Sequence, residues 1–112
     1  MAIITDEYMK QMLESAKEYS VCIIKMTPRR GDPGANQIVW EHGRRNFSLR
    51  ADGILSIVCP ISDGSGVSGV YIFNADTHKV KEIMEQDPAV KAGIFTYEVH
   101  PSQSFPGDLL PE

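Results

Sequence analysis

Residues 74–101 read NADTHKVKEIMEQDPAVKAGIFTYEVHP, and this stretch decides the fold because it holds a helix and a strand with clear boundaries. Asp76 is a good N-cap residue, and Pro88 prevents a helix from continuing past the residue before it. The stretch therefore predicts a helix from about Thr77 to Gln86 and a strand at 94–99. The apolar residues that recur at helical spacing in this helix are Val80, Ile83 and Met84.

Two short apolar runs lie immediately upstream of this helix. The first, Ile54–Cys59, ends at Pro60, and the second is Val70–Asn74. The Gly/Ser segment 64–69 between them matches GxGxxG, but a dinucleotide-binding loop follows a strand and opens a helix, whereas this segment leads into a strand. We therefore predict a β-hairpin with a flexible loop.

The first half of the chain contributes one more strand and two more helices. Val21–Thr27 is an apolar, β-branched run and predicts a strand. A helix is expected over about Gln37–Ala51, opened by Asn36. Residues 6–19 predict an amphipathic helix capped by Thr5.

The predicted order is a helix followed by β-α-β-β-α-β, which is the ferredoxin-like arrangement of the α+β class. We expect one domain over residues 1–112, with an N-terminal helical extension at 1–19 and an irregular tail at 102–112. The first three strands are apolar at successive positions, which indicates that both faces of the sheet are covered. Two helices cover one face, so a second copy of the chain, or the N-terminal helix as the rival cover, must supply the other. We expect a homodimer.

Composition and charge narrow the class of protein. Of the 112 residues, 42% are hydrophobic and 23% charged, with a net charge of −4, which is typical of a soluble globular protein and disfavours a nucleic-acid partner. No run approaches the roughly 20 apolar residues of a membrane span, and the first residues do not resemble a secretory signal, so we expect a cytoplasmic protein. Cys22 and Cys59 lie in apolar runs without CxxC spacing, which predicts two buried free thiols.

Asp87 is the most informative polar residue because it continues the apolar stripe of the third predicted helix. A carboxylate directed into a protein interior needs hydrogen-bond donors or a cation. The position before Pro88 also suits a capping or turn residue. Both interpretations stay open from these residues alone.

His42 is the second candidate and lies on the side of its predicted helix that carries Asn46, next to Trp40, which we expect to be buried. A histidine held by a carboxylate can accept or donate a proton near neutral pH, although packed or surface histidines are more common. Arg45 shares this helix side and is a candidate for binding a small anionic substrate, unless it belongs to a solvated face. The histidines lack the paired spacing of a zinc site, so we expect no metal and no cofactor.

Two motifs, read together, carry a resemblance to a known family. The segment HGRRNFSLRADGIL at 42–55 matches a helix with His followed by apolar positions and Gly, and the segment at 74–101 matches a capped helix that ends at Asp-Pro before Ala-Gly and the last strand. Over residues 20–101 the chain resembles the YciI-like (YCII-related) family of the dimeric α+β barrel superfamily. The resemblance implies that His42 and Asp87 meet in a pocket as an acid-base pair.

The resemblance also implies the class of chemistry. Related dimeric α+β barrels include muconolactone isomerases, chlorohydroquinone dehydrochlorinases and monooxygenases, so we expect a small cofactor-independent enzyme of lyase, isomerase or oxygenase type that acts on a small anionic or phenolic metabolite. The alternatives are a non-catalytic small-molecule-binding or stress-associated dimer, and a purely structural subunit. Fold analogy does not choose among them.

Overall fold

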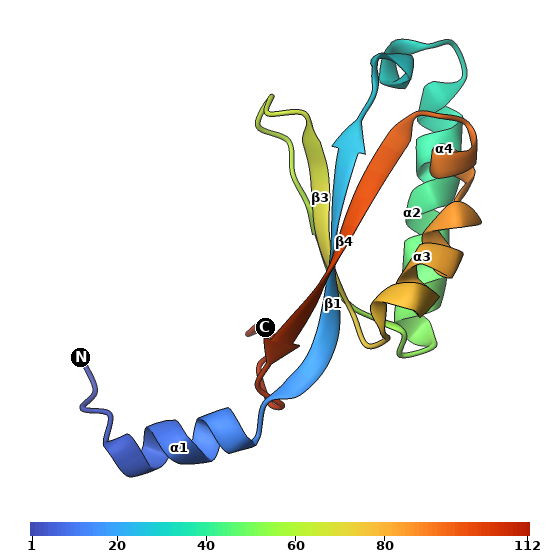
Figure 1. Ribbon diagram of the computed structural model, residues 1–112. Coiled ribbons are helices and arrows are strands. Elements are labelled where there is room, and N and C mark those ends of the chain that lie inside the picture. Colours follow the sequence, from blue (N-terminus) through green and yellow to red (C-terminus); the bar gives the residue numbers. More distant parts are fainter.

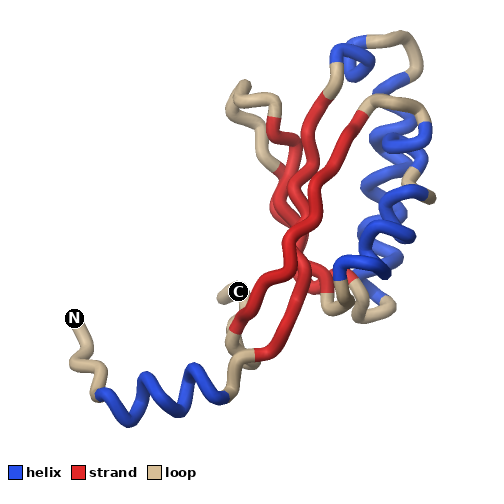
Figure 2. Tube along the Cα trace, viewed as in Figure 1, coloured by secondary structure: helices blue, strands red, loops and turns tan.

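The computed structural model describes all residues 1–112 and confirms an α+β fold of the ferredoxin-like type. A four-stranded antiparallel sheet with the order β2-β3-β1-β4 carries α2, α3 and α4 on one face, whereas α1 lies beyond the end of the sheet (Figure 1). Figure 2 shows the same two layers, with the strands in red and the helices in blue. The elements are α1 (Asp6–Glu14), β1 (Lys17–Met26), η1 (Pro28–Gly31), α2 (Ala35–Ala51), β2 (Leu55–Pro60), β3 (Val67–Phe73), α3 (Thr77–Glu85), α4 (Pro88–Lys91) and β4 (Phe95–Ser104).

The central strand β1 sets which side chains enter the core. It pairs with β3 and β4, and Cys22 lies opposite Tyr71 on one side and Val99 on the other. Because side chains alternate along a strand, every second residue of β1 and β3 points towards the helices. These inward residues are fully or nearly fully buried: Ser20, Cys22, Ile24, Tyr71 and Phe73.

The two long helices on the sheet differ in the side chains that they direct towards it: those of α3 are apolar, and some of those of α2 are polar. Helix α3 buries Val80, Ile83 and Met84, as its stripe predicts. Each such side chain contributes about 1.5–3 kcal/mol when removed from water. Helix α2, by contrast, buries His42 and Asn46 along with Ala35, so it presents polar groups to the sheet. This polar face of α2 creates the candidate site.

Several predicted boundaries are wrong, and long-range pairing is the main reason. Helix α1 stops at Glu14 rather than at residue 19, because residues 17–19 pair with residues 102–104 of β4. Strand β4 consequently extends through the first three residues of the predicted irregular tail. Helix α2 begins after Gly34, whose φ of 83° suits only glycine, instead of after Asn36.

Two residues expected in the interior lie at the surface. Trp40 is 66% exposed because it faces away from the sheet on α2. Cys59 is exposed on the edge strand β2, whereas Cys22 is buried on the central strand, so the prediction of two buried thiols holds only for Cys22. Both thiols are free, as predicted.

The face of the sheet opposite the helices has no second layer of helices (Figure 1), and it is apolar on β1 and β3 but polar on β4, where His100 and Glu98 lie beside Val21 and Ile23. Val21 pairs with Ile72, and Ile23 with Val70, and all four alternate with inward residues. Helix α1 does not cover them, because it projects beyond the end of the sheet and buries none of its residues. The alternative prediction, that the N-terminal helix covers this face of the sheet, is therefore wrong. None of the helices combines the length and apolar character that crossing a bilayer requires.

Candidate active site

His42 of α2 and Asp87 at the start of α4, which are 45 residues apart in the sequence, lie in direct contact. The imidazole Nδ1 is 2.7 Å from Asp87 Oδ1. Only 4% of His42 and 1% of Asp87 is exposed. The contact that the two motifs imply is therefore present, and it is shielded from water, where charge-assisted hydrogen bonds are strong.

Asp87 is both a helix-capping residue and a carboxylate directed into the interior. Its Oδ2 accepts hydrogen bonds from the amides of Ala89, at 2.9 Å, and Val90, at 3.2 Å, so the side chain caps the short helix α4. Pro88 occupies the first helical position, where its missing N–H costs nothing. One carboxylate oxygen caps α4 and the other contacts His42, so the capping residue and the inward carboxylate are the same group.

The Asp87 contact determines the tautomer of the imidazole. An ionised carboxylate only accepts hydrogen bonds, so Nδ1 carries the proton and, in the neutral ring, Nε2 is an acceptor. Tyr71 Oη lies 2.9 Å from Nε2 and donates to it. The Asn46 amide nitrogen lies 3.2 Å from Tyr71 Oη and 3.3 Å from Nε2, so it donates to this end of the site. A continuous chain thus runs from Asn46 through Tyr71 and His42 to Asp87.

Tyr71 stays protonated over the working range of pH. Burial raises the pKa of the phenol to about 12, the hydrogen bond from Asn46 opposes the rise, and the negative charge of Asp87 adds to it. Burial, followed by the charge of Asp87, also raises the pKa of the Cys22 thiol to about 12. Tyr71 therefore acts as a neutral O–H donor, and Cys22 is an inert thiol rather than a nucleophile.

Two aromatic rings fix the imidazole in place. Phe95 meets it edge-on with ring centroids 5.0 Å apart, and Tyr71 stacks at 6.1 Å with an interplanar angle of 30°. Phe95 begins β4 and Tyr71 lies within β3, so two strands and α2 together orient the ring.

Arg45 is the member of the site that reaches solvent. Its Nη1 is 3.8 Å from Asp87 Oδ1, which is an ion pair without a short hydrogen bond, and 27% of its side chain is exposed. The guanidinium places a permanent positive charge between the buried carboxylate and the surface. No group of three or more His, Cys, Asp and Glu side chains is arranged to hold a metal ion.

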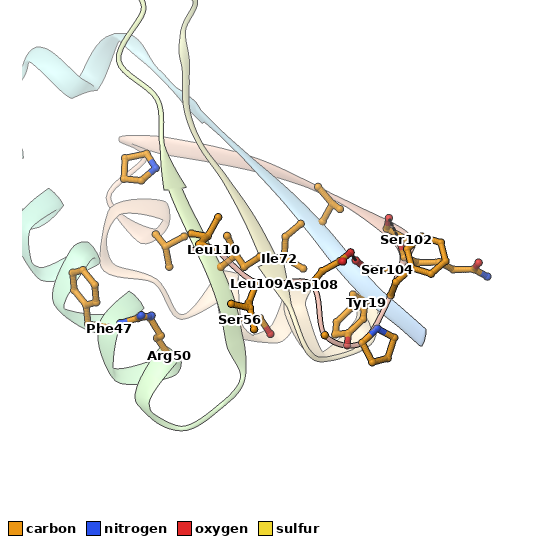
Figure 3. A pocket seen from close by; sticks show the side chains of 18 residues that line it. Tyr19, Phe47, Arg50, Ser56, Ile72, Ser102, Ser104, Asp108, Leu109 and Leu110 are labelled. Atoms are coloured by element: carbon orange, nitrogen blue, oxygen red, sulfur yellow. Dashed lines mark hydrogen bonds between the residues drawn. The ribbon is translucent and has the colours of Figure 1, made fainter. Parts of the chain in front are cut away.

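Two surface cavities lie near the site, and neither is lined by His42 or Asp87. The larger, about 680 Å³, lies between the C-terminal tail and the sheet, and Figure 3 shows Phe47 and Arg50 of α2 at one end and Tyr19 of β1 at the other. The smaller, about 550 Å³, lies on the outer face of α2, and Phe47 lines both.

Tyr71 and Asn46 complete the site, and sequence reasoning assigned neither a role. The signals were present in part, because Asn46 lies four residues after His42 on one helix side, and a buried tyrosine needs a partner for its hydroxyl. The pairing of Tyr71 with His42, however, depends on how β3 aligns with β1 and where α2 crosses them. No local sequence pattern predicts this strand register or the position at which α2 crosses the sheet.

In the comparison with known proteins, no family model and no curated protein matches the chain. The YciI-like resemblance therefore stays a prediction, and function is argued from the geometry of the site.

Proposed function

We propose that the protein is a small cofactor-independent acid-base catalyst in which His42 exchanges a proton with a small metabolite through the hydroxyl of Tyr71, and Asp87 orients and stabilises the imidazole. The observation that carries the proposal is the 2.7 Å contact between Nδ1 and Oδ1 in a buried site whose second carboxylate oxygen is held by two backbone amides. A buried, fully hydrogen-bonded histidine and carboxylate pair is the arrangement that general acid-base chemistry uses.

Proton transfer in this proposal runs through Tyr71. Its hydroxyl oxygen takes the proton from the substrate while its own proton passes to His42 Nε2, 2.9 Å away. The two transfers occur together because the high pKa of Tyr71 disfavours a free phenolate. The resulting imidazolium is stabilised by the carboxylate of Asp87, and the electron pair stays on the substrate as an enolate or phenolate.

The substrate class follows from this chemistry and from the charge near the site. Acidic protons beside a carbonyl or on a phenol can be removed by such a pair, which leads to isomerisation, elimination of a leaving group, or oxygenation of an activated aromatic by O₂. Arg45 supplies the positive charge that favours an anionic or phenolic metabolite. Because His42 is 4% exposed, entry of a substrate requires movement of the surrounding side chains.

Turnover of an unsaturated lactone and of a chlorinated hydroquinone tests the proposal. We expect His42→Ala to lower turnover by about 100-fold or more. His78→Ala is the matched control, because His78 also contacts a carboxylate, Glu82 Oε1 at 3.0 Å, but on the surface of α3. Equal activities of the two variants would contradict a catalytic His42.

A non-catalytic small-molecule-binding protein is the second candidate function. It is favoured by the fact that both imidazole nitrogens already have protein partners. In this case wild-type protein turns over none of the probes, and His42→Ala changes only ligand affinity, measured by calorimetry. A stress-associated role would be tested by expression under oxidative and thermal stress.

We also propose that two copies associate through the open face of the sheet and that the protein is cytoplasmic. The apolar pair Ile23–Val70 supports association, because apolar side chains on a sheet face without a second layer are costly in water. The neighbouring pair Val21–Ile72 lines the cavity beneath the C-terminal tail. The exposed free thiol of Cys59 supports a reducing compartment. Sedimentation equilibrium tests the first proposal, and a monomer at all concentrations would contradict it; cell fractionation tests the second.

A further inference from the structure

Helix α1 has an apolar stripe that nothing in its own chain covers. Tyr8, Met9 and Leu13 are 48%, 49% and 62% exposed, and no residue of the helix is buried. A helix of nine residues is too short to be stable in water by itself, so its stability must come from packing against another surface. Figure 1 shows α1 directed away from the body of the molecule.

The outer face of α2 carries the complementary surface, which we call the α2 groove. It is a cavity of about 550 Å³ with two largely exposed aromatic walls, Trp40 at 66% and Phe47 at 63%. Gly43 lies between them in the sequence, and a Cβ placed there would meet no atom within 4 Å. The groove is therefore open enough to receive bulky apolar side chains.

The charges of the two surfaces are opposite. Helix α1 carries three carboxylates, Asp6, Glu7 and Glu14, against the single ammonium of Lys10. The α2 groove is flanked by Arg30 and Arg44, and Glu41, whose Oε2 accepts from Arg44 Nε at 3.1 Å, offsets one of these two positive charges. An acidic amphipathic helix is repelled by an anionic membrane surface and attracted by a basic groove.

The dimensions of the two surfaces also agree. Nine helical residues span about 14 Å, and the seven-residue step from Trp40 to Phe47 spans about 10 Å along α2. An amphipathic helix that lays its apolar side chains into such a groove is a recurrent mode of recognition.

We propose that α1 of one copy binds the α2 groove of a second copy, and that the exchange is reciprocal. A two-fold arrangement buries both arms with one kind of contact. The inference is independent of the chemistry at His42, and it concerns a surface other than the open sheet face.

Mixed cross-linking tests this exchange. Two chains are prepared without the exposed thiol of Cys59 by Cys59→Ser, one carrying Leu13→Cys and the other Gly43→Cys, and they are mixed and treated with a short bismaleimide. We expect a covalent product of twice the chain mass that contains one copy of each variant. The matched control replaces Leu13→Cys by Gln11→Cys, which lies on the opposite side of α1 from Leu13 and is also exposed, and it should cross-link far less. Equal yields for the two, or none for Leu13→Cys, would overturn the proposal.

Two further measurements distinguish the exchange between copies from binding of α1 to its own α2 and from association through the sheet face alone. A single chain that carries both Leu13→Cys and Gly43→Cys should yield the doubled mass; cross-linking within one chain would show that α1 folds back on its own α2 and would overturn the exchange. The exposed-site variant Leu13→Asp should raise the dimer dissociation constant about tenfold or more by sedimentation. An unchanged constant would overturn the arm exchange while leaving an association through the sheet face intact.

Discussion

Replacement of Asp87 by asparagine tests the strength of the contact on which the site depends. The change removes the charge that accepts the 2.7 Å hydrogen bond from His42 Nδ1 but retains an amide oxygen able to cap Ala89 and Val90. Hydrogen bonds to charged groups contribute about 1.5–3 kcal/mol, and the loss of one partner of a buried pair costs about 3–5 kcal/mol. We expect Asp87→Asn to lower the free energy of unfolding by about 3 kcal/mol.

A double-mutant cycle separates the contact from the cap. Urea unfolding of Asp87→Asn, His42→Gln and the double variant should give a coupling energy of about 2 kcal/mol or more. Asp76→Asn is the control, because Asp76 also caps a helix, through the Lys79 amide at 2.8 Å, but is exposed and contacts no histidine. Its cost should be below about 0.5 kcal/mol, since asparagine caps as well as aspartate. A coupling within about 0.5 kcal/mol of zero would refute the reasoning.

Three other expectations concern ionisation, reactivity and backbone conformation. Burial raises the pKa of Tyr71 from 10 to about 12, so its contribution to stability is complete below pH 10 and is lost as the pH rises towards 12. The melting temperature should therefore fall over this range, and it should fall less in Tyr71→Phe. An equal fall in the wild-type protein and in Tyr71→Phe would contradict the raised pKa of Tyr71. A thiol reagent should titrate Cys59 alone in the folded protein and Cys22 only after denaturation; two rapidly reacting thiols would show that the β1 side of the core is open. Gly34→Ala should destabilise the protein by about 1 kcal/mol in urea because φ is 83° there, and no change would mean that α2 begins differently.

The features that could be predicted from the sequence are those set by local chemistry. Asp76 caps α3 and Pro88 follows its end, so this helix was predicted almost to the residue. Asp87 was predicted to face inward because it continues the apolar stripe of α3, and it is buried, but the reason was wrong: α3 ends at Glu85, and Asp87 lies beyond it with extended backbone as the N-cap of α4. The order of strands and helices likewise followed from apolar runs and turn residues.

The features that could not be predicted depend on contacts between distant segments. The end of α1 and the length of β4 are decided by pairing between residues 17–19 and 102–104, which no local pattern records. Trp40 was expected inside because tryptophan is apolar, but α2 turns its polar residues to the sheet and leaves Trp40 outside. Tyr71 joined the site only through the register of β3 on β1.

The tautomer of His42 tests the central claim most directly and needs no substrate. Two-bond ¹⁵N–¹H correlation spectra of ¹⁵N-histidine protein, recorded where the rings are neutral, distinguish a protonated from a bare ring nitrogen, and the exposed His78 and His100 serve as internal references. The account predicts that His42 carries its proton on Nδ1, with Nε2 bare and accepting from Tyr71, and that Asp87→Asn abolishes this preference. A proton on Nε2 in the wild-type protein would contradict it.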